Sequence, residues 1–355
     1  RPWLDAVCAA SAPQLRAFGP QALANTACAL AQMDHAPPPH WVAAFLHACL
    51  EAWAPRPPPP AAQGAAAGSP TAASHARPPA AAPPPPPQAL ALTLWAVARL
   101  GLRPGGAWLD AMAAAAAADA PRMNGQDVAN VLWALGALRY RPGQAPHPAL
   151  SRTGVAGAPR AAASAAGQRP GLEGGVSCSD GDAAAAAPGL VLVPLLAAWR
   201  RCAEGMEPQQ LSACLVAAAH MQLGAAGAGG AAEQAWLWAL AALGRRLGTA
   251  SGQCVANALW AAARLGCRPS NVWMVAAVAR FAECLEEDDG GPQVGGAWAG
   301  PECPFPGRGR EAANVWWALG RLRWAPAPEV GQQLLVRTLL LVASGDLRSG
   351  EVAMF

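Results

Sequence analysis

The sequence contains no lysine, so all 25 of its basic residues are arginine. This absence excludes the phosphate-binding loop that ends in Gly-Lys-Ser or Gly-Lys-Thr. Charged residues make up only 13% of the 355 residues, and the net charge of +3 permits a nucleic-acid partner without indicating one. Tyrosine occurs once and phenylalanine five times against 15 tryptophans, so the aromatic side chains are mostly indoles.

Patterns typical of metal binding and catalysis are also missing. None of the ten cysteines forms a C-x-x-C pair, and His35 and His40 lack the spacing of metal ligands on a helix. The acidic run at residues 286–289 is expected in a solvated loop. Six thiols fall inside apolar helical patterns and are expected as core residues of a reducing compartment: Cys8, Cys28, Cys49, Cys214, Cys254 and Cys284. The sequence therefore predicts no catalytic site, no metal site and no cofactor.

No apolar run is long enough for a membrane-spanning helix. The best candidate, residues 183–199, is shorter than the roughly 20 residues required and is interrupted by Pro188 and Pro194. We interpret it as the end of an insert followed by a helix, and we expect no membrane insertion. Because the chain starts at Arg1 and opens inside a repeat, we expect it to be a piece of a longer protein whose targeting peptide is not included.

What the sequence does contain is a repeated segment, Gln-x-x-x-Asn-x-x-Trp-Ala-x-x-Arg-Leu-Gly-x-Arg-Pro. Its clearest copies are QDVANVLWALGALRYRP, from Gln126, and QCVANALWAAARLGCRP, from Gln253. We take the Asn as the anchor position and count the other positions from it. The six anchors are Asn25, Leu92, Asn130, Ala213, Asn257 and Asn314. The shortest interval between anchors, from residue 92 to residue 130, gives a natural period of 38 residues.

Each repeat is predicted to form two helices. Pro20, Pro87 and Pro208 stand just before the Gln, where a helix tolerates proline in its first turn, and Gly101 and Gly266 are expected to end the helix. A second helix follows the Pro at +12, because a Trp recurs sixteen residues after the anchor as Trp41, Trp108 and Trp273, and Trp3 opens the same pattern. A pair of helices cannot bury both faces alone. The predicted fold is therefore all-α, an α-solenoid of tandem two-helix repeats.

Composition divides the chain into repeats and inserts. Helical repeats are expected in residues 1–53, 88–142, 189–285 and 310–355. Between them lie a Pro/Ala-rich insert at 54–87, a Gly/Ala/Ser-rich insert at 143–188, and an acidic then Gly/Pro-rich insert at 286–309. Such segments cannot bury an apolar face, so we expect them to be disordered loops.

One stripe of the helix that carries the Gln and Asn contains the candidate functional residues, because positions 0, +3, +7 and +11 share a helix face. Stacking would align the arginines into columns that match the spaced phosphates of a nucleic acid. These phosphate-binding candidates are Arg99, Arg103, Arg141, Arg264, Arg268 and Arg321. The candidates for base stacking are Trp95, Trp133, Trp260 and Trp317. In the alternative interpretation, the Trp residues fill space between repeats, the Asn residues bond to neighbouring backbone, and the Arg residues lie along Trp faces or cap helix C-termini.

A residue that is identical in every repeat cannot distinguish one base from another, so base recognition would need variable positions. Candidates flank the Trp that recurs sixteen residues after the anchor, in the other helix of each repeat: Asp5, His40, Asp110 and Val272.

The motifs from Gln126 and Gln253, with the preceding Pro-x-x-x-Trp-Leu segment, resemble the octotricopeptide repeat family of green algae, which is distantly FAST-kinase-like. The resemblance covers nearly all of the chain outside the inserts, although Cys28 and Val216 replace the Trp in two copies. It implies sequence-selective binding of single-stranded organellar RNA, in the chloroplast stroma or alternatively the mitochondrial matrix. It also implies roles in mRNA stability, RNA processing or translation, within a ribonucleoprotein complex that contains other proteins. No counterpart of the family's nuclease-like RAP domain occurs in the sequence, which predicts a protein that is not an enzyme. The alternative function is a protein-binding scaffold without direct RNA binding.

Overall fold

The computed structural model describes residues 2–53, 84–141, 190–223, 229–286 and 308–345. Within these ranges the secondary structure consists of α-helices and short 3-10 helices, with no strand, which confirms the predicted all-α class. The three predicted inserts, and with them the expected loops, lie outside the described residues except at their edges. Among the described helices, none combines the length and the apolar character needed to cross a membrane.

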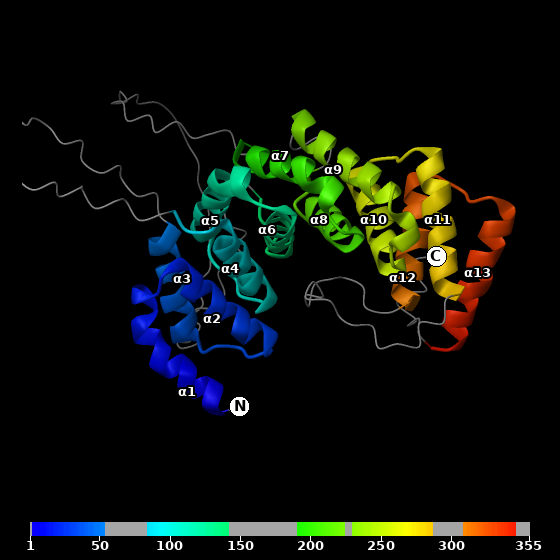
Figure 1. Cartoon of the computed structure of the whole chain (residues 1–355). Helices are drawn as coiled ribbons and strands as arrows, with labels where there is room; N and C mark the ends of the chain where they lie inside the picture. The colour runs from blue at the N-terminus through cyan, green and yellow to red at the C-terminus, as the bar shows by residue number, and fades with distance from the viewer. Residues whose placement is uncertain (1, 54–83, 142–189, 224–228, 287–307, 346–355) are drawn as a thin grey trace, which may run out of the picture.

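The six copies of the repeated motif form six helices that stack side by side in sequence order, which we call the inner row (Figure 1). The inner row consists of α2 (Pro20–Gln32), α4 (Pro87–Arg99), α6 (Gly125–Ala137), α8 (Pro208–His220), α10 (Gly252–Leu265) and α12 (Arg308–Leu322). In Figure 1 these helices follow the inner side of an arch. The repeat detected in the sequence is therefore also the structural unit of the stack.

A second set of helices, the outer row, covers the outer side of the arch (Figure 1). The row starts with α1 (Pro2–Ser11) and the 3-10 helix η1 (Ala12–Ala17), and continues with α3 (Pro39–Trp53), α5 (Gly106–Asp119), α7 (Val193–Cys202), α9 (Gly229–Gly244), α11 (Asn271–Glu286) and α13 (Pro328–Ala343). Each outer helix contacts the next one, and each from α3 onward also packs on the inner helix that precedes it in the sequence. Sequential packing of neighbouring pairs is the architecture of an α-solenoid.

All six inner helices end in the same way. The residue at +9 has a positive φ in every copy, and the residue at +10 donates its N–H to the carbonyl at +5 at 2.9–3.1 Å. This is the 6→1 bond of a Schellman cap. Gly101 and Gly266 supply the left-handed residue as predicted, and the other four copies use Asp34, Arg139, Gln222 and Arg323. The motif thus enforces one turn geometry even where the residue type does not favour it.

The helix starts also follow the predicted pattern. Pro20, Pro87 and Pro208 lie in the first turns of α2, α4 and α8. In α6, Asn124 accepts a bond from the Asp127 N–H at 2.9 Å while its own N–H donates to the Asp127 carboxylate, which makes a capping box. Proline in the first turn or a capping box thus marks the start of four inner helices, α2, α4, α6 and α8.

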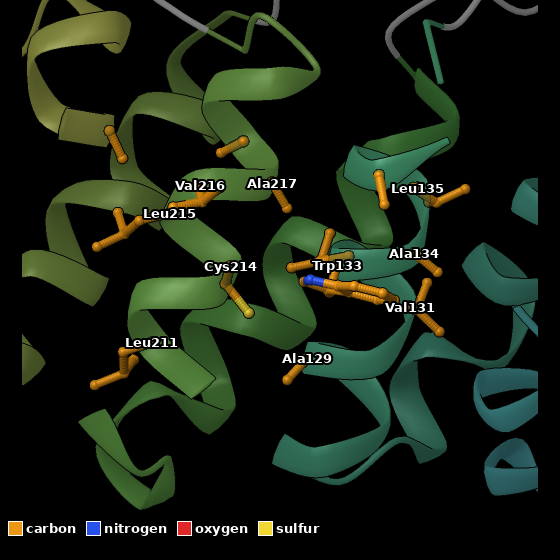
Figure 2. Packing of buried hydrophobic residues seen from close by; sticks show 14 of the residues in the cluster. Ala129, Val131, Trp133, Ala134, Leu135, Leu211, Cys214, Leu215, Val216 and Ala217 are labelled. Atoms are coloured by element: carbon orange, nitrogen blue, oxygen red, sulfur yellow. The ribbon is translucent and has the colours of Figure 1, made fainter. Parts of the chain in front are cut away.

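Small residues let the inner helices approach closely. An ideal Cβ added to Gly136 of α6 would lie 2.6 Å from the Cα of Ala217 in α8, closer than real Cβ atoms come. Figure 2 shows Trp133 of α6 and Cys214 and Ala217 of α8 in the space between these two helices. The absence of a side chain at Gly136 therefore permits the close approach of α6 and α8. The six thiols expected in the core are all buried, and none of them forms a disulfide bond.

Candidate nucleic-acid interface

The predicted stripe lines a cavity of about 370 Å³ across α2, α4 and α6 of the inner row. Position 0 contributes Asn25, Leu92 and Asn130, and position +3 contributes Cys28 and Trp95. The remaining lining residues are Ala29, Gln32 and Gln126. Three successive repeats therefore place equivalent positions around one hollow, as a periodic ligand requires.

Side-chain amides form short chains across this surface. Gln21 Nε2 donates to Asn25 Oδ1 at 2.9 Å, and Gln126 Nε2 donates to Asn130 Oδ1 at 3.4 Å. Both pairs join position −4 to the anchor, one helical turn apart. Gln210 Nε2 of α8 donates to Gln126 Oε1 at 2.6 Å and so links two inner helices. In these two repeats the anchor Asn therefore bonds to a Gln side chain, and not to neighbouring backbone as the alternative interpretation expected.

The anchor Asn side chains of the last two inner helices, α10 and α12, each have an atom without a hydrogen-bond partner among the described residues. Asn257 and Asn314 are buried, and within the described part of the chain neither Asn257 Oδ1 nor Asn314 Nδ2 has a hydrogen-bond partner. Buried amides of this kind are usually paired, because leaving them unpaired is costly. The two amides therefore retain hydrogen-bonding capacity beneath the inner surface.

The four candidate Trp residues divide into two environments. Trp95 and Trp133 are buried, which fits the interpretation that they fill space between repeats. Trp260 and Trp317 are only half-buried. Trp260 has the Arg264 guanidinium 5.8 Å from its ring centroid, an example of the predicted Arg–Trp contact. Trp317 borders a second cavity, of about 520 Å³, together with Trp316, Trp324 and Arg321. These two indoles offer the more accessible aromatic faces.

The candidate arginines gather at one edge of the inner row, where its helices end. Arg99, Arg264 and Arg321 lie in or next to the last helical turns, and Arg103, Arg141 and Arg268 follow in the next loop. We call this the arginine edge. It also includes Arg139 and Arg323, which occupy the left-handed position at +9. Sequence reasoning missed these two residues, although their fixed distance from the anchor could have identified them.

Charge pairing distinguishes this edge from the rest of the molecule. No ion pair with a carboxylate of the described residues is found for Arg99, Arg141, Arg268 or Arg321. Five arginines of the outer row and its loops, by contrast, pair with carboxylates: Arg16 with Glu51, Arg122 with Asp119, Arg245 with Glu204, Arg280 with Glu283 and Arg337 with Glu286. Three others, Arg200, Arg201 and Arg246, donate to a side-chain amide or to backbone carbonyls. These four arginines therefore keep positive charge available for a partner, although charge there also complements the helix C-termini.

Carboxylates are scarce along the inner row. Its six helices contain two, Asp127 and Glu311, and both are buried in the first turn, at the opposite end from the arginine edge. Burial raises the pKa of the Glu311 carboxyl to about 7, although Arg308 acts in the opposite direction. The carboxylates of the inner helices, Asp127 and Glu311, are therefore not exposed on the inner surface, where they could repel a polyanion.

The four base-recognition candidates lie near the N-terminal ends of outer helices, on the same side of the array as the arginine edge. Asp5 contacts His35 Nε2 at 3.3 Å, and Asp110 accepts a bond from the Tyr140 hydroxyl at 3.0 Å. In both cases the partner lies in the loop that directly follows the inner helix of the next repeat. The structure brings these carboxylates into contacts between repeats, whereas His40 and Val272 are exposed.

The middle of the inner row interrupts the stripe. Helix α8 carries Ala213 at the anchor, Val216 at +3 and His220 at +7. The His220 ring meets the Trp260 ring edge-on, with centroids 5.5 Å apart. Polar and aromatic residues of the stripe therefore form two groups, one over α2, α4 and α6 and one over α10 and α12.

The described residues contain no group of three or more His, Cys, Asp or Glu side chains placed to hold a metal ion. Burial raises the pKa of the Cys28 thiol, which lines the first cavity, to about 11, so this thiol is protonated at neutral pH.

Comparison with models of known protein families finds no match, and a search among curated proteins finds no significantly similar sequence.

Proposed function

We propose that this chain binds single-stranded RNA along its inner row, with the phosphates at the arginine edge. The observation that carries the proposal is the segregation of charge. Arg99, Arg141, Arg268 and Arg321 lack carboxylate partners among the described residues, whereas five arginines of the outer row and its loops have one. Arginine that is not neutralised internally is suited to phosphate oxygens, which it binds in a forked geometry.

The surface beside this edge favours a single strand over a duplex. Its cavities are lined by amides such as Asn25, Gln32 and Gln126 and by the indoles Trp317 and Trp324. Unpaired bases expose hydrogen-bonding edges to amides and flat faces to aromatic rings, and a duplex hides both. We infer that one repeat meets about one base, as in other helical RNA-binding repeats.

The finer features of the proposal rest on the sequence. We propose a natural repeat length of 38 residues, the interval between the anchors Leu92 and Asn130. We also propose membership of the octotricopeptide repeat family, on the motif that begins at Gln126. Membership implies an organellar transcript as ligand, in the chloroplast stroma or the mitochondrial matrix. A bound array would act without catalysis, by shielding a transcript from nucleases or by keeping it accessible to processing or translation factors.

A protein-binding scaffold is the second candidate, and one observation favours it. A cavity of about 390 Å³ lies on the outer row between α7 and α9. It is lined by Val193, Arg200 and Trp238, with the Arg200 guanidinium 5.2 Å from the centroid of the Trp238 ring. Partly exposed aromatic and arginine side chains are common in protein interfaces. In this second candidate function, the chain presents the hollow to another protein and does not bind RNA directly.

A salt titration of RNA binding tests the proposal. The test variant replaces Arg141, Arg268 and Arg321 with Ala, and the control replaces Arg16, Arg122 and Arg245, so both lose three positive charges. Each lost phosphate contact on a single strand reduces the slope of log K against log salt by about 0.7. We expect the slope to fall by up to about 2 in the test variant and to change little in the control. Equal slopes in the two variants, or no binding by the unmodified chain, would refute the proposal.

A further inference from the structure

The cavity of about 370 Å³ across α2, α4 and α6 has one buried amide in its lining, that of Asn130. Asn130 is 5% exposed, and it lies in the lining together with the buried side chains of Cys28 and Trp95. The other amides of the lining are exposed. Asn130 therefore determines which polar group a ligand meets in the depth of this cavity.

The orientation of the amides around Asn130 follows from a backbone donor. An amide side chain can turn over, which exchanges its oxygen and its NH2 group, so its partners determine which of the two faces a ligand. At the start of α8, the Glu207 N–H donates to Gln210 Oε1 at 2.9 Å. A backbone N–H can only donate, so Gln210 must keep its oxygen toward Glu207 and its Nε2 directed elsewhere.

Two further hydrogen bonds carry this orientation from α8 to α6. Gln210 Nε2 donates to Gln126 Oε1 at 2.6 Å, which leaves Gln126 Nε2 to donate to Asn130 Oδ1 at 3.4 Å. We call Gln210, Gln126 and Asn130 the amide chain. Among the described residues, Asn130 Nδ2 has no acceptor. Asn130 therefore has its oxygen engaged and its N–H groups available to a ligand in the cavity.

The second amide pair beside this cavity has no such fixed donor. Gln21 Nε2 donates to Asn25 Oδ1 at 2.9 Å, but no partner among the described residues holds Gln21 in one orientation. If both amides turn over, the same hydrogen bond forms in the reverse direction, so Asn25 can offer either its oxygen or its NH2 group. Selectivity in this cavity therefore depends on Asn130.

We propose that this cavity binds an RNA base with a carbonyl oxygen on its pairing edge, uracil or guanine, and discriminates against cytosine and adenine. The inference rests on the proposed RNA binding. Uracil O4 and guanine O6 accept hydrogen bonds, whereas cytosine and adenine carry an NH2 group at the equivalent position. That group would meet the NH2 group of Asn130, and neither could accept from the other. Polar groups left unpaired in a buried site should weaken binding about tenfold or more.

Gln210→Glu tests the proposal by reversing the amide chain. Gln210 does not line the cavity and is a positioning residue, because it acts on Asn130 through Gln126. A carboxylate only accepts, so Gln126 would turn its Nε2 toward position 210 and its oxygen toward Asn130. Asn130 would then donate to Gln126 and present its own oxygen to the cavity. Glu is a usual residue at this position of a capping box, so circular dichroism should show that the variant folds.

Gln209→Glu is the matched control. It adds the same negative charge at the neighbouring residue of α8, which is exposed and lies outside the amide chain. Fluorescence anisotropy would measure the affinities of the unmodified chain and both variants for oligouridine and oligocytidine of equal length. Because the added charge weakens the binding of both RNAs, the ratio of the two affinities isolates the preference for one base.

The unmodified chain should favour oligouridine. The ratio should fall about tenfold in Gln210→Glu and stay unchanged in Gln209→Glu. The inference is overturned if the unmodified chain does not favour oligouridine, if its preference persists in Gln210→Glu, or if both variants change the ratio equally. In each of these cases the RNA binding itself still stands. Failure of the unmodified chain to bind either oligonucleotide would instead refute the proposed function.

Discussion

Replacing Gly136 with Ala tests the packing of the inner row. The new methyl group would lie 2.6 Å from the Cα and 2.7 Å from the Cβ of Ala217, both inside the contact distance of carbon atoms. Because one obstacle is backbone, α6 and α8 must separate by an appreciable fraction of an ångström. Overpacking of this kind costs about 1–3 kcal/mol. The better helix propensity of Ala recovers roughly 0.5–1 kcal/mol, so we expect a net loss of about 1–2 kcal/mol.

Gly320→Ala is the matched control, because it makes the same chemical change at the same repeat position. An added Cβ at Gly320 meets nothing within 4 Å, so only the gain in helix propensity remains. We expect this variant to be more stable by about 0.5–1 kcal/mol. Urea denaturation followed by circular dichroism measures both changes. Hydrogen exchange of peptides from α6 and α8 checks that the loss at Gly136 is local, since repeat arrays can unfold in parts. Shifts of the same sign in the two variants would refute the packing argument.

Two further predictions concern buried side chains of the inner row. Glu311 has its pKa raised from 4.5 to about 7, so the folded protein binds its proton more tightly than the unfolded chain and stability falls as pH rises from about 4.5 to 7. The Glu311→Gln variant should not show this loss of stability, which is at most about 3 kcal/mol. Urea denaturation of both proteins at pH 5 and pH 8 would detect the difference. The same pH dependence of stability in the variant and the unmodified chain would contradict the prediction. Trp133→Ala should cost about 3–5 kcal/mol of stability, whereas Trp317→Ala, at a half-buried site, should cost clearly less and weaken RNA binding roughly tenfold. Equal losses of stability in the two Trp variants would show that their environments do not differ as described.

Much of the fold could be predicted from fixed offsets within the repeat. The positions of Gln, Asn and Pro fixed the six inner helices, and the recurring Trp located outer helices such as α3 and α5. The left-handed cap at +9 was predictable from residue type only at Gly101 and Gly266. Arg139 and Arg323 adopt it because the turn geometry of the array outweighs the cost for a side chain at positive φ.

The candidate site was only partly predictable, because exposure depends on neighbours that a local pattern does not specify. Trp133 and Trp317 occupy the same position in nearly identical motifs, yet Trp133 is covered by α8 and Trp317 lies in the last inner helix, which has no following one in the described array. The same reasoning applies to Asp110, whose bond to Tyr140 spans two repeats. The ion pairs between five arginines of the outer row and its loops and nearby carboxylates, which distinguish those arginines from the arginine edge, could also be identified only from the folded structure.

Crosslinking of a bound oligonucleotide tests the central claim most directly. A single-stranded RNA containing photoreactive uridines would be irradiated in complex with the unmodified chain, and the crosslinked peptides would be identified by mass spectrometry. The account predicts crosslinks in the inner helices and the loops that follow them, above all around Trp260 and Trp317. Crosslinks confined to outer helices such as α7 and α9, or none at all, would contradict the claim that RNA lies along the inner row.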